Sequence, residues 1–549
     1  MPLQKNQVLT LQVERLSSDG SGVAHSPEGE TVFIPGAAPG DEARVRIVKD
    51  CKRYAFGILD EVLTPSPDRI PVDCAVAGPC GGCSLRHLDY AAELRAKQEN
   101  VADAFARIGG LDVPVLPIVG SPEIDRYRNK VQFPVGTDKA GRPCIGFYAG
   151  RTHRIVPCPD CRLQPGVLNE IGNTLCAFFA EKGIHPYNEE TGKGLVRHIF
   201  LRRGAHSGQI MVCLVCTRAK LPSADELCTR LKEAFPDIVT ILLNVNAKNT
   251  NVILGSETHT LYGQGYIEDT LCGVPVQLGP LSFYQVNTLA AEQLYGIAAE
   301  YAQLTPDDLL LDLYCGMGTI GLSMADHCRE LVGVEIVPEA IESAKANAAR
   351  MGAAVSAKSR FFCADAGQAA TQLAAEGLHP DVVMLDPPRK GCDEATLSAV
   401  VRMAPRRVVY VSCNPATAAR DAAWLEQNGY HAEKVQPVDL FPRTKHCECV
   451  IALSKGEIDS KKVRVEFSLE GMDTSGLQKG ATYPEIKARV LEQTGLKVSS
   501  LYISQVKQKC GLEVRENHHK AKSENTKQPQ CPKEKEDAIV EALKHFQMI

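Results

Sequence analysis

The chain has 549 residues, of which 44% are hydrophobic and 23% charged, and its formal net charge is −5 at pH 7. This length is too great for one hydrophobic core and predicts three or four domains, and the slight negative charge means that any nucleic-acid-binding surface must be local. No stretch approaches the ~18 apolar residues of a membrane span, and the start MPLQKNQVLT lacks the regions of a signal peptide, so a cytoplasmic protein is expected.

Residues 1–62 are predicted to form a small all-β domain. Four β-rich runs, QVLTLQVERL, GETVFIPG, DEARVRIVKD and RYAFGILDEVL, are separated by Gly, Pro and Asp turns, which is typical of a small barrel of the oligonucleotide-binding kind. Basic residues adjoin Tyr54 and Phe56 in this region: Arg44, Arg46, Lys49, Lys52 and Arg53. This mixture suits a groove that tracks phosphates and stacks bases, and a solvated barrel edge is an equally good interpretation.

The Pro-rich stretch TPSPDRIP marks a boundary, and a mixed α/β domain is predicted over 63–275, with a helix at about 88–108. Near its start, CAVAGPCGGC contains Cys74, Cys80 and Cys83. The chain has 21 cysteines and no secretory signal is expected, so such a cluster indicates a metal site or reactive thiols rather than disulfides. The glycine spacer allows two thiolates to converge on one ion.

A fourth ligand is required, and the segment HRIVPCPDCRLQ offers Cys158 and Cys161. Four thiolates suit either zinc or an iron–sulfur cluster. The pair Cys213 and Cys216, in QIMVCLVCTR, is a poorer candidate. Residues three apart on a strand point to opposite faces, so these two are expected to be core thiols.

Strands alternate with helices over 276–455, which predicts a mostly parallel, doubly wound sheet. A helix is expected over 337–352. The expected strands lie at 309–315, 331–336, 360–366, 381–386, 407–413 and 449–454.

The first of these strands runs into a glycine turn with the pattern G-x-G-x-x-G, formed by Gly316, Gly318 and Gly321. Glu335, at the end of the next strand, is placed to accept hydrogen bonds from ribose hydroxyls. This geometry serves both NAD and S-adenosylmethionine. Asp386, which is followed by two prolines, helps to decide between these two cofactors. The prolines force the chain out of the sheet at the edge where ligands bind. An acid-Pro-Pro turn there favours a methyltransferase over a dehydrogenase.

Cys413 ends the next strand, in VVYVSCNPATAARD, on the same edge as Asp386. A small core residue is the ordinary interpretation of such a cysteine. Carbon 5 of a pyrimidine becomes reactive toward a methyl donor only after a thiolate adds at carbon 6, and a thiol at a helix N-terminus is biased toward thiolate. A base must then remove the carbon-5 proton. Glu448, in FPRTKHCECVIAL, is the candidate, although its pattern alone favours a surface residue.

Residues 456–549 are predicted to be a separate accessory module. VRVEF suits a strand, and TYPEIKARVLEQTG suits a helix with a capping box formed by Thr482 and Glu485. SSLYISQVKQKCG suits a second helix. A helix-turn-helix or winged-helix module and a small packing appendage are both compatible with this pattern.

From residue 1 to about 455 the chain resembles the RNA uracil-5-methyltransferases, most closely their 23S ribosomal RNA branch. The matching motifs are FYQVN, DLYCGMGTIGL, VGVE, DPPRKG, SCNP and FPRTKHCE. The N-terminal barrel resembles a TRAM domain, an RNA-binding module. The resemblance implies methylation of carbon 5 of a uridine, with RNA as the partner, S-adenosylmethionine as the cofactor and no protein partner.

By the same resemblance Cys413 is the nucleophile and Glu448 the base. The resemblance also implies that a [4Fe-4S] cluster is held by Cys74, Cys80, Cys83 and Cys161, and that Asp365 is a less certain neighbour of the adenine. The residues implied at the S-adenosylmethionine site are Gln285, Tyr314, Glu335 and Asp386. The residues implied along the RNA side of the cleft, in YRNKVQF, are Arg128, Asn129, Lys130 and Gln132.

Three other functions are compatible with parts of this pattern. A transfer-RNA uridine-5-methyltransferase would use the same chemistry. An exocyclic-amine methyltransferase would need no thiol, because its target nitrogen already has a lone pair. An iron–sulfur RNA-binding scaffold with an inactive transferase domain would bind RNA without S-adenosylmethionine.

Overall fold

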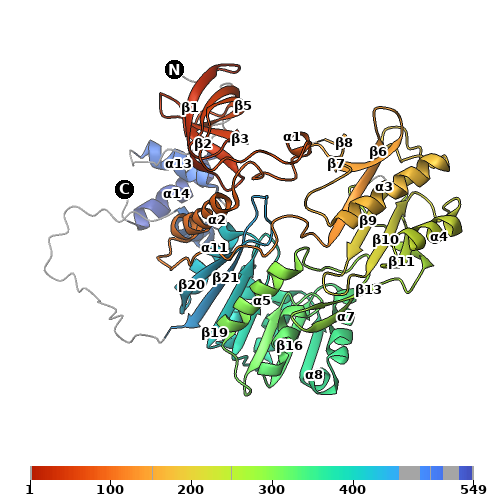
Figure 1. Ribbon diagram of the computed structural model, residues 1–549. Helices are drawn as coiled ribbons and strands as arrows, with labels where there is room; N and C mark the ends of the chain where they lie inside the picture. The colour runs from red at the N-terminus through yellow and green to blue at the C-terminus, as the bar shows by residue number, and fades with distance from the viewer. Residues whose placement is uncertain are drawn as a thin grey trace. The chain divides into compact units, whose positions relative to one another are not determined.

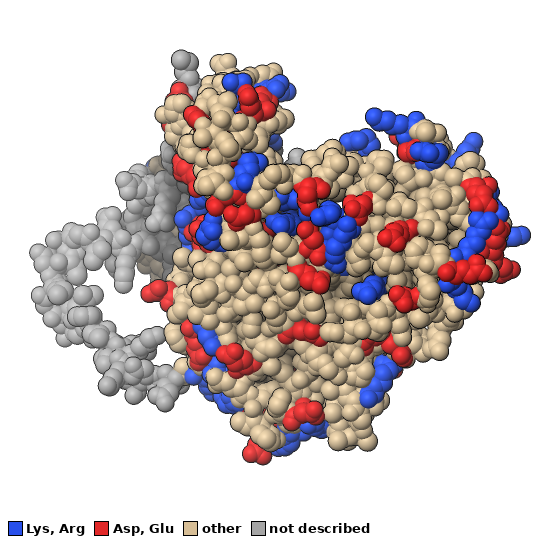
Figure 2. Space-filling view, in the orientation of Figure 1, with Lys and Arg blue, Asp and Glu red and all other residues tan. Residues whose placement is uncertain are grey.

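The computed structural model describes residues 3–150, 152–248, 250–456, 483–494, 496, 498–510 and 531–546. The chain divides into two compact units, Met1–Asp459 and Ser460–Ile549. None of the helices within the described ranges is long and apolar enough to cross a membrane. On the face shown in Figure 2, acidic and basic side chains are interspersed, which agrees with a small net charge.

The first five strands close into a barrel in the order β1-β2-β3-β5-β4, as the sequence predicts (Figure 1). Along β4, Ala43, Val45 and Ile47 are fully buried and alternate with outward residues. A Cβ on Gly57 of β5 would lie 2.3 Å from the Val45 side chain, so the close approach of these two strands requires glycine. The barrel strands are β1 Val8–Leu16, β2 Ser21–His25, β3 Thr31–Pro35, β4 Glu42–Asp50 and β5 Tyr54–Thr64.

Two of the basic residues expected to form a groove on this barrel are neutralised. The Arg44 guanidinium lies 2.7 Å from the Glu61 carboxylate, and Arg46 donates two hydrogen bonds to Asp60, at 3.1 and 2.7 Å. The acids belong to β5, which pairs with β4. The sequence pattern shows the basic residues but not the carboxylates that face them across the strand pair. Because these carboxylates neutralise them, Arg44 and Arg46 are poor candidates for binding phosphate.

The barrel is followed by a short helix α1, Ala77–Cys80, and a longer helix α2, Tyr90–Ala104, in the predicted region. Asp89 caps α2 by accepting the N–H of Ala92 at 2.7 Å. A single π-helical turn, Phe105–Gly109, ends the segment.

The central domain contains a seven-stranded sheet in the order β12-β11-β10-β9-β6-β7-β8. Helices α3, Gly166–Glu181, and α4, Ala224–Ala234, share one hydrophobic core with this sheet. Cys216 belongs to that core, whereas Cys213 belongs to the core shared with the following domain, so the two thiols of β10 point to opposite faces as predicted. The strands are β6 Lys130–Thr137, β7 Pro143–Tyr148, β8 Ile155–Pro157, β9 Val196–Arg203, β10 Ile210–Cys216, β11 Ile238–Val245 and β12 Glu257–Tyr262.

A hairpin, β13 Ile267–Leu271 and β14 Val274–Leu278, leads into the second seven-stranded sheet, whose order is β17-β16-β15-β18-β19-β21-β20. The first five of these strands are parallel, and β21 is antiparallel to both of its neighbours. Strand β15 is buried along its whole length, as expected for a sheet covered on both faces. The strands are β15 Leu309–Leu313, β16 Glu330–Glu335, β17 Ser359–Cys363, β18 Val382–Leu385, β19 Arg407–Ser412, β20 Tyr430–Val438 and β21 Glu448–Lys455.

Seven helices of this domain pack with the sheet into two hydrophobic cores. The doubly wound sheet was predicted, but strand β20 was not, because YHAEKVQPV mixes charged residues and a proline with few apolar ones. The helices are α5 Thr288–Ala302, α6 Thr319–Ser323, α7 Pro338–Arg350, α8 Ala353–Lys358, α9 Ala366–Ala375, α10 Glu394–Met403 and α11 Pro415–Gln427.

The second unit contains helices α12, Tyr483–Thr494, α13, Ser500–Lys509, and α14, Lys533–His545. They share a small core of their own that includes Ile486, Ile503 and Ile539. The two helices expected from the sequence are therefore present. The expected strand VRVEF and the capping residue Thr482 lie outside the described residues.

Candidate active site

The glycine turn after β15 places backbone N–H groups at the carboxyl edge of the sheet. Tyr314, Gly316 and Gly318 have φ angles of 67°, 55° and 78°, in the left-handed region. Gly321 donates its N–H to the Asp312 carboxylate at 3.0 Å, and a Cβ at this position would lie 2.8 Å from the same carboxylate. The turn therefore has the tight geometry that the glycine pattern predicts.

Glu335 lies beside this turn at the end of β16. One of its carboxylate oxygens accepts the N–H of Gly316 at 3.2 Å, and the other accepts the N–H of Val337 at 2.9 Å. The carboxylate is held where a ribose beside the glycine turn would meet it. Tyr314, another predicted cofactor residue, lies on the turn itself with its hydroxyl 3.3 Å from the Thr396 hydroxyl.

Asp386 follows directly after β18, which ends at Leu385, so the chain leaves the sheet where the two prolines predict. Burial raises the pKa of Asp386 to about 7. Burial also raises the pKa of Asp312 to about 8, with Asp386 and Glu335 adding to the shift, and the Asp312 Oδ1 atom is buried without a hydrogen-bond partner. A positively charged cofactor such as S-adenosylmethionine would favour the ionised forms of these carboxyl groups.

Gln285 lies between β14 and α5, and its side chain hydrogen-bonds with Tyr295. Its backbone is fixed by Asn129, whose side-chain amide donates to the Gln285 carbonyl at 2.8 Å and to the Thr288 hydroxyl at 2.9 Å. Asn129 is buried, so the expectation that it lies along an RNA-facing surface is wrong. Its neighbour Lys130 is partly buried, and burial together with Arg202 and Arg128 lowers the Lys130 pKa to about 8.

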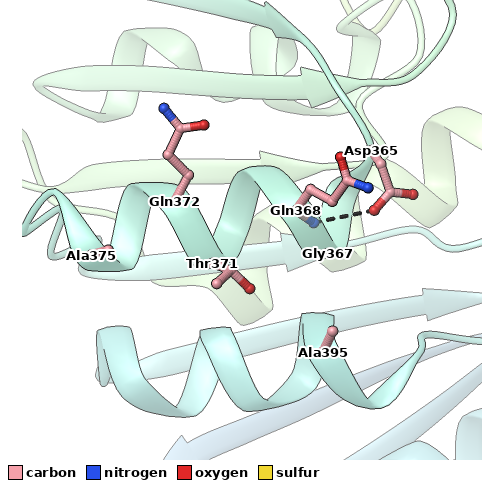
Figure 3. Close-up of a pocket in the computed structure, with 7 residues that line it drawn as sticks. All are labelled: Asp365, Gly367, Gln368, Thr371, Gln372, Ala375 and Ala395. Atoms are coloured by element: carbon pink, nitrogen blue, oxygen red, sulfur yellow. Dashed lines mark hydrogen bonds between the residues drawn. The ribbon is translucent and has the colours of Figure 1, made fainter.

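Asp365, the less certain adenine neighbour, caps α9 by accepting the N–H of Gln368 at 3.1 Å (Figure 3). It borders a hollow of about 440 Å³ formed by the start of α10 and the side chains of α9. The other residues that line this hollow are Gly367, Gln368, Thr371, Gln372, Ala375 and Ala395. This lining includes neither a cation nor an aromatic ring.

Cys413 lies between the end of β19 at Ser412 and the start of α11 at Pro415, as predicted. It is partly buried and lines a cavity of about 520 Å³. Burial raises the Cys413 pKa, the nearby carboxyl groups of Glu448 and Asp386 raise it further, and a hydrogen bond from Arg389 offsets part of the shift. Its pKa is thus raised rather than lowered, in contrast to the expected bias toward thiolate, because burial and two acids disfavour the charged form.

Glu448 is the first residue of β21, and β21 pairs directly with β19, so that Cys449 lies opposite Ser412. Glu448 is buried, which excludes a surface residue. Burial and the Asp386 carboxyl raise the Glu448 pKa to about 8, and Arg389 acts in the opposite direction. A thiol and a protonatable carboxyl group thus meet at the ends of two adjacent strands.

Buried polar groups fix the loop that precedes Glu448. Lys97, on α2, places its ammonium 2.7 Å from both Glu93 and Asp439 and 3.2 Å from the Phe441 carbonyl. Glu93 also accepts the N–H of Arg443 at 2.7 Å. All three charged groups are buried, and removing one partner of such a network leaves an uncompensated charge. Helix α2 therefore positions the loop that leads to the candidate base.

The cavity beside Cys413 is lined by β1 and its following turn, by helix α2 with the π-turn, and by three loops, which carry Arg389, Cys413 and His446. Arg15 of the barrel lies 3.0 Å from Asp103 of α2 across this cavity. The basic residues in its wall are Arg15, Lys97, Arg107, Arg389 and Lys445. Arg15 and Arg107 pair with Asp103, and Lys97 pairs with Glu93 and Asp439. Arg389 and Lys445 are therefore the better candidates to attract a polyanion toward Cys413.

Arg389 was missed as a functional residue. It hydrogen-bonds with Cys413, lines the same cavity, and lowers the pKa of both Cys413 and Glu448. The sequence feature that could have identified Arg389 is its position in DPPRKG, directly after the turn that carries Asp386.

The cysteines at the start of the central domain approach the other predicted pair. Cys80 and Cys83 both have pKa values raised chiefly by burial and further by Cys161. Cys158 and Cys161 hydrogen-bond with each other, which lowers the Cys161 pKa and raises that of Cys158. Among the described residues, no group of three or more His, Cys, Asp or Glu side chains is arranged to hold a metal ion. Cys80, Cys83 and Cys161 are close enough to affect one another's pKa, but the described residues do not show the arrangement that the predicted cluster requires.

The chain matches known proteins along most of its length. A family model described as tRNA (uracil-5-)-methyltransferase matches residues 276–456, and a TRAM domain model matches residues 2–59. An uncharacterized RNA methyltransferase of Halalkalibacterium halodurans is 44% identical over 453 residues, which are 82% of this chain and 98% of that protein. An uncharacterized RNA methyltransferase of Bacillus cereus is 42% identical over 457 residues, 83% and 98% of the two chains.

Among solved structures, the chain is similar to the Pyrococcus abyssi tRNA (uracil-54, C5)-methyltransferase in complex with S-adenosyl-L-homocysteine. The two share 27% identity with a TM-score of 0.64, and the similarity covers 81% of this chain and all (100%) of the other.

Proposed function

Because the chain belongs to the RNA uracil-5-methyltransferase family, we propose that it methylates carbon 5 of a uridine in RNA, with Cys413 as the nucleophile and Glu448 as the base. The observation that supports this proposal is the meeting of a partly buried thiol and a buried carboxyl group on adjacent strands beside Asp386. An exocyclic-amine methyltransferase has no use for the thiol.

In this mechanism the Cys413 thiolate adds to carbon 6 of the flipped uracil, and the electron pair of the ring moves to carbon 5. S-adenosylmethionine supplies an electrophilic methyl group, which carbon 5 accepts. Glu448, as carboxylate, then removes the carbon-5 proton, and the sulfur–carbon bond breaks to restore the ring. Arg389 favours the charged forms of both Cys413 and Glu448.

Gln285, Tyr314, Glu335 and Asp386 form the proposed S-adenosylmethionine site. Glu335 holds the ribose, and the acids around the glycine turn offset the cofactor's positive charges. The barrel over 1–62 and the central domain over 63–275 hold the RNA, the domain over 276–455 performs the chemistry, and 456–549 is an accessory module.

The proposed substrate is 23S ribosomal RNA, on the basis of the motifs that resemble that branch. A transfer RNA is the second candidate, because the similar Pyrococcus abyssi structure is named for a tRNA substrate.

Deletion of the gene tests this substrate. We expect the 5-methyluridine of purified 23S ribosomal RNA to decrease, as measured by mass spectrometry of nuclease digests, and that of transfer RNA to stay constant. A decrease in transfer RNA alone would support the second candidate. If neither RNA changes and the purified enzyme methylates neither transcript, the proposed function is wrong.

We further propose that Cys74, Cys80, Cys83 and Cys161 hold a [4Fe-4S] cluster that orders the central domain, since methyl transfer requires no net electron flow. Cys161 is favoured over Cys158 by its surroundings. The Gln164 side-chain amide donates to the Cys161 sulfur at 3.7 Å, and hydrogen bonds to sulfur favour the thiolate form that binds metal.

Protein purified without oxygen is expected to contain about four iron atoms per chain. Cys80→Ser and Cys161→Ser should lose most of this iron, as measured by metal analysis, while Cys158→Ser should retain it. Cys213→Ser is the control, because Cys213 is buried on the far side of β10 from α3. Iron-free protein that is folded and active would contradict the proposal.

A further inference from the structure

We propose that the barrel carries a second RNA-binding site, outside the cavity of Cys413, at which unpaired bases stack on an aromatic platform formed by Phe33, Tyr54 and Phe56. This inference rests on the proposed function, since it concerns how the RNA substrate is held.

The three rings form one cluster on the outside of the barrel. The ring centroids are 5.8 Å apart for Phe33 and Tyr54, 5.9 Å for Phe33 and Phe56, and 5.6 Å for Tyr54 and Phe56. Strands β3 and β5 run in parallel, with Phe33 opposite Phe56. Their neighbours Val32 and Ala55 are fully buried, so the rings point away from the barrel core, and Tyr54 is 41% exposed.

Cations without a carboxylate partner surround this platform. Lys49 lies opposite Phe56 across β4 and β5, and Lys52 and Arg53 lie in the turn that joins these strands. Within the described part of the chain, none of these three forms an ion pair, in contrast to Arg44 and Arg46. The nearby Asp50 carboxylate accepts the backbone N–H of Lys52 at 2.7 Å. Aromatic rings flanked by free cations match the bases and phosphates of single-stranded RNA.

The platform lies outside the cavity of Cys413, two strands away from its wall. Arg15 of β1, which lines the cavity, is opposite Val23 of β2, and Val23 is opposite Phe33 of β3. Two strand spacings are about 10 Å. None of the three rings is part of the cavity lining, so a base on the platform is a different nucleotide from the target uridine.

A folded protein is the competing occupant of such a surface. RNA is favoured because stacking accepts any base, the three cations outnumber the nearby Asp50 carboxylate, and the barrel matches an RNA-associated TRAM domain. A protein surface would require side chains complementary in shape to three tilted rings.

The test uses the full-length double variant Tyr54→Ala/Phe56→Ala. Both side chains point outward, so the barrel core is unchanged. We expect it to bind a single-stranded oligouridylate of about 25 nucleotides at least ~10-fold more weakly than the unaltered protein in fluorescence anisotropy. Leu63→Ala is the matched control, because Leu63 is 39% exposed on the opposite end of the same strand, and its affinity should not change.

At saturating RNA and S-adenosylmethionine, the double variant should retain its kcat while its KM for RNA rises, since the chemistry takes place elsewhere. Unchanged affinity in the double variant, an equal loss in Leu63→Ala, or a fall in kcat would each overturn the inference. The binding measurement does not depend on methylation, so it can fail or succeed independently of the proposed function.

Discussion

Cys413→Ala is expected to reduce methyl transfer by at least ~10⁴-fold while S-adenosylmethionine binding stays within a few-fold of its original value. Without the thiolate, carbon 5 of uracil is too weak a nucleophile to take the methyl group. The proposed cofactor contacts come from the turn after β15 and from Glu335, which this change does not touch. Transfer of labelled methyl groups to RNA and calorimetry with the cofactor measure the two effects.

Cys328→Ala is the matched control for this change. Cys328 is buried immediately before β16, at the opposite edge of the same sheet, so its removal tests for a general disturbance of the sheet. The unaltered protein should also form a stable covalent adduct with RNA containing 5-fluorouridine, because the fluorine replaces the proton that Glu448 removes. Cys413→Ala should form none. Full activity in Cys413→Ala, or an adduct that survives its loss, would refute the covalent mechanism.

The sequence predicts the parts of this site that depend on local chain geometry. The two prolines after Asp386 make the chain leave the sheet, and the apolar run before Cys413 forms a buried strand. Asp386 and Cys413 therefore lie at the carboxyl edge of the sheet, where they were expected. The glycine turn and Glu335 follow from the same reasoning. In each case one short segment determines the placement.

The parts that depend on distant segments could not be predicted. Lys97 and Asp439 are separated by 342 residues, and nothing in either segment indicates that they form a buried ion pair. Arg44 and Arg46 are neutralised by acids on the next strand, and Asn129 is buried against α5. The Cys413 pKa is raised because Glu448 and Asp386 converge on it, which no single motif contains.

Glu448→Gln is expected to reduce turnover by about 10²–10⁴-fold and to leave a methylated protein–RNA adduct on ordinary uridine. Cys413 can still add and carbon 5 can still accept the methyl group, but the carbon-5 proton is not removed, so the sulfur cannot leave. Denaturing gel electrophoresis with labelled S-adenosylmethionine measures this adduct. Turnover without an adduct in this variant would assign the base to another residue.

The same carboxyl group should make the protein's stability depend on pH. The pKa of Glu448 rises from 4.5 to about 8 on folding, so between these values the folded state binds more protons than the unfolded state and loses stability as the pH rises. Glu448→Gln removes this loss. It should therefore unfold at a higher temperature than the unaltered protein at pH 9, and the difference should vanish near pH 4.

Glu433→Gln provides the opposite sign on the neighbouring strand. Its carboxylate lies 3.0 Å from Arg407, and despite the opposing effect of burial its pKa is lowered by hydrogen bonds with Arg407 and Ser454. The stabilisation from Glu433 is present above the unfolded pKa and is lost as the pH falls, so Glu433→Gln should destabilise the protein at pH 9. If both variants shift the unfolding temperature in the same direction at pH 9, ionisation of the buried Glu448 does not destabilise the folded protein. The Glu448 pKa is then not raised toward neutral pH, as the proposed base requires.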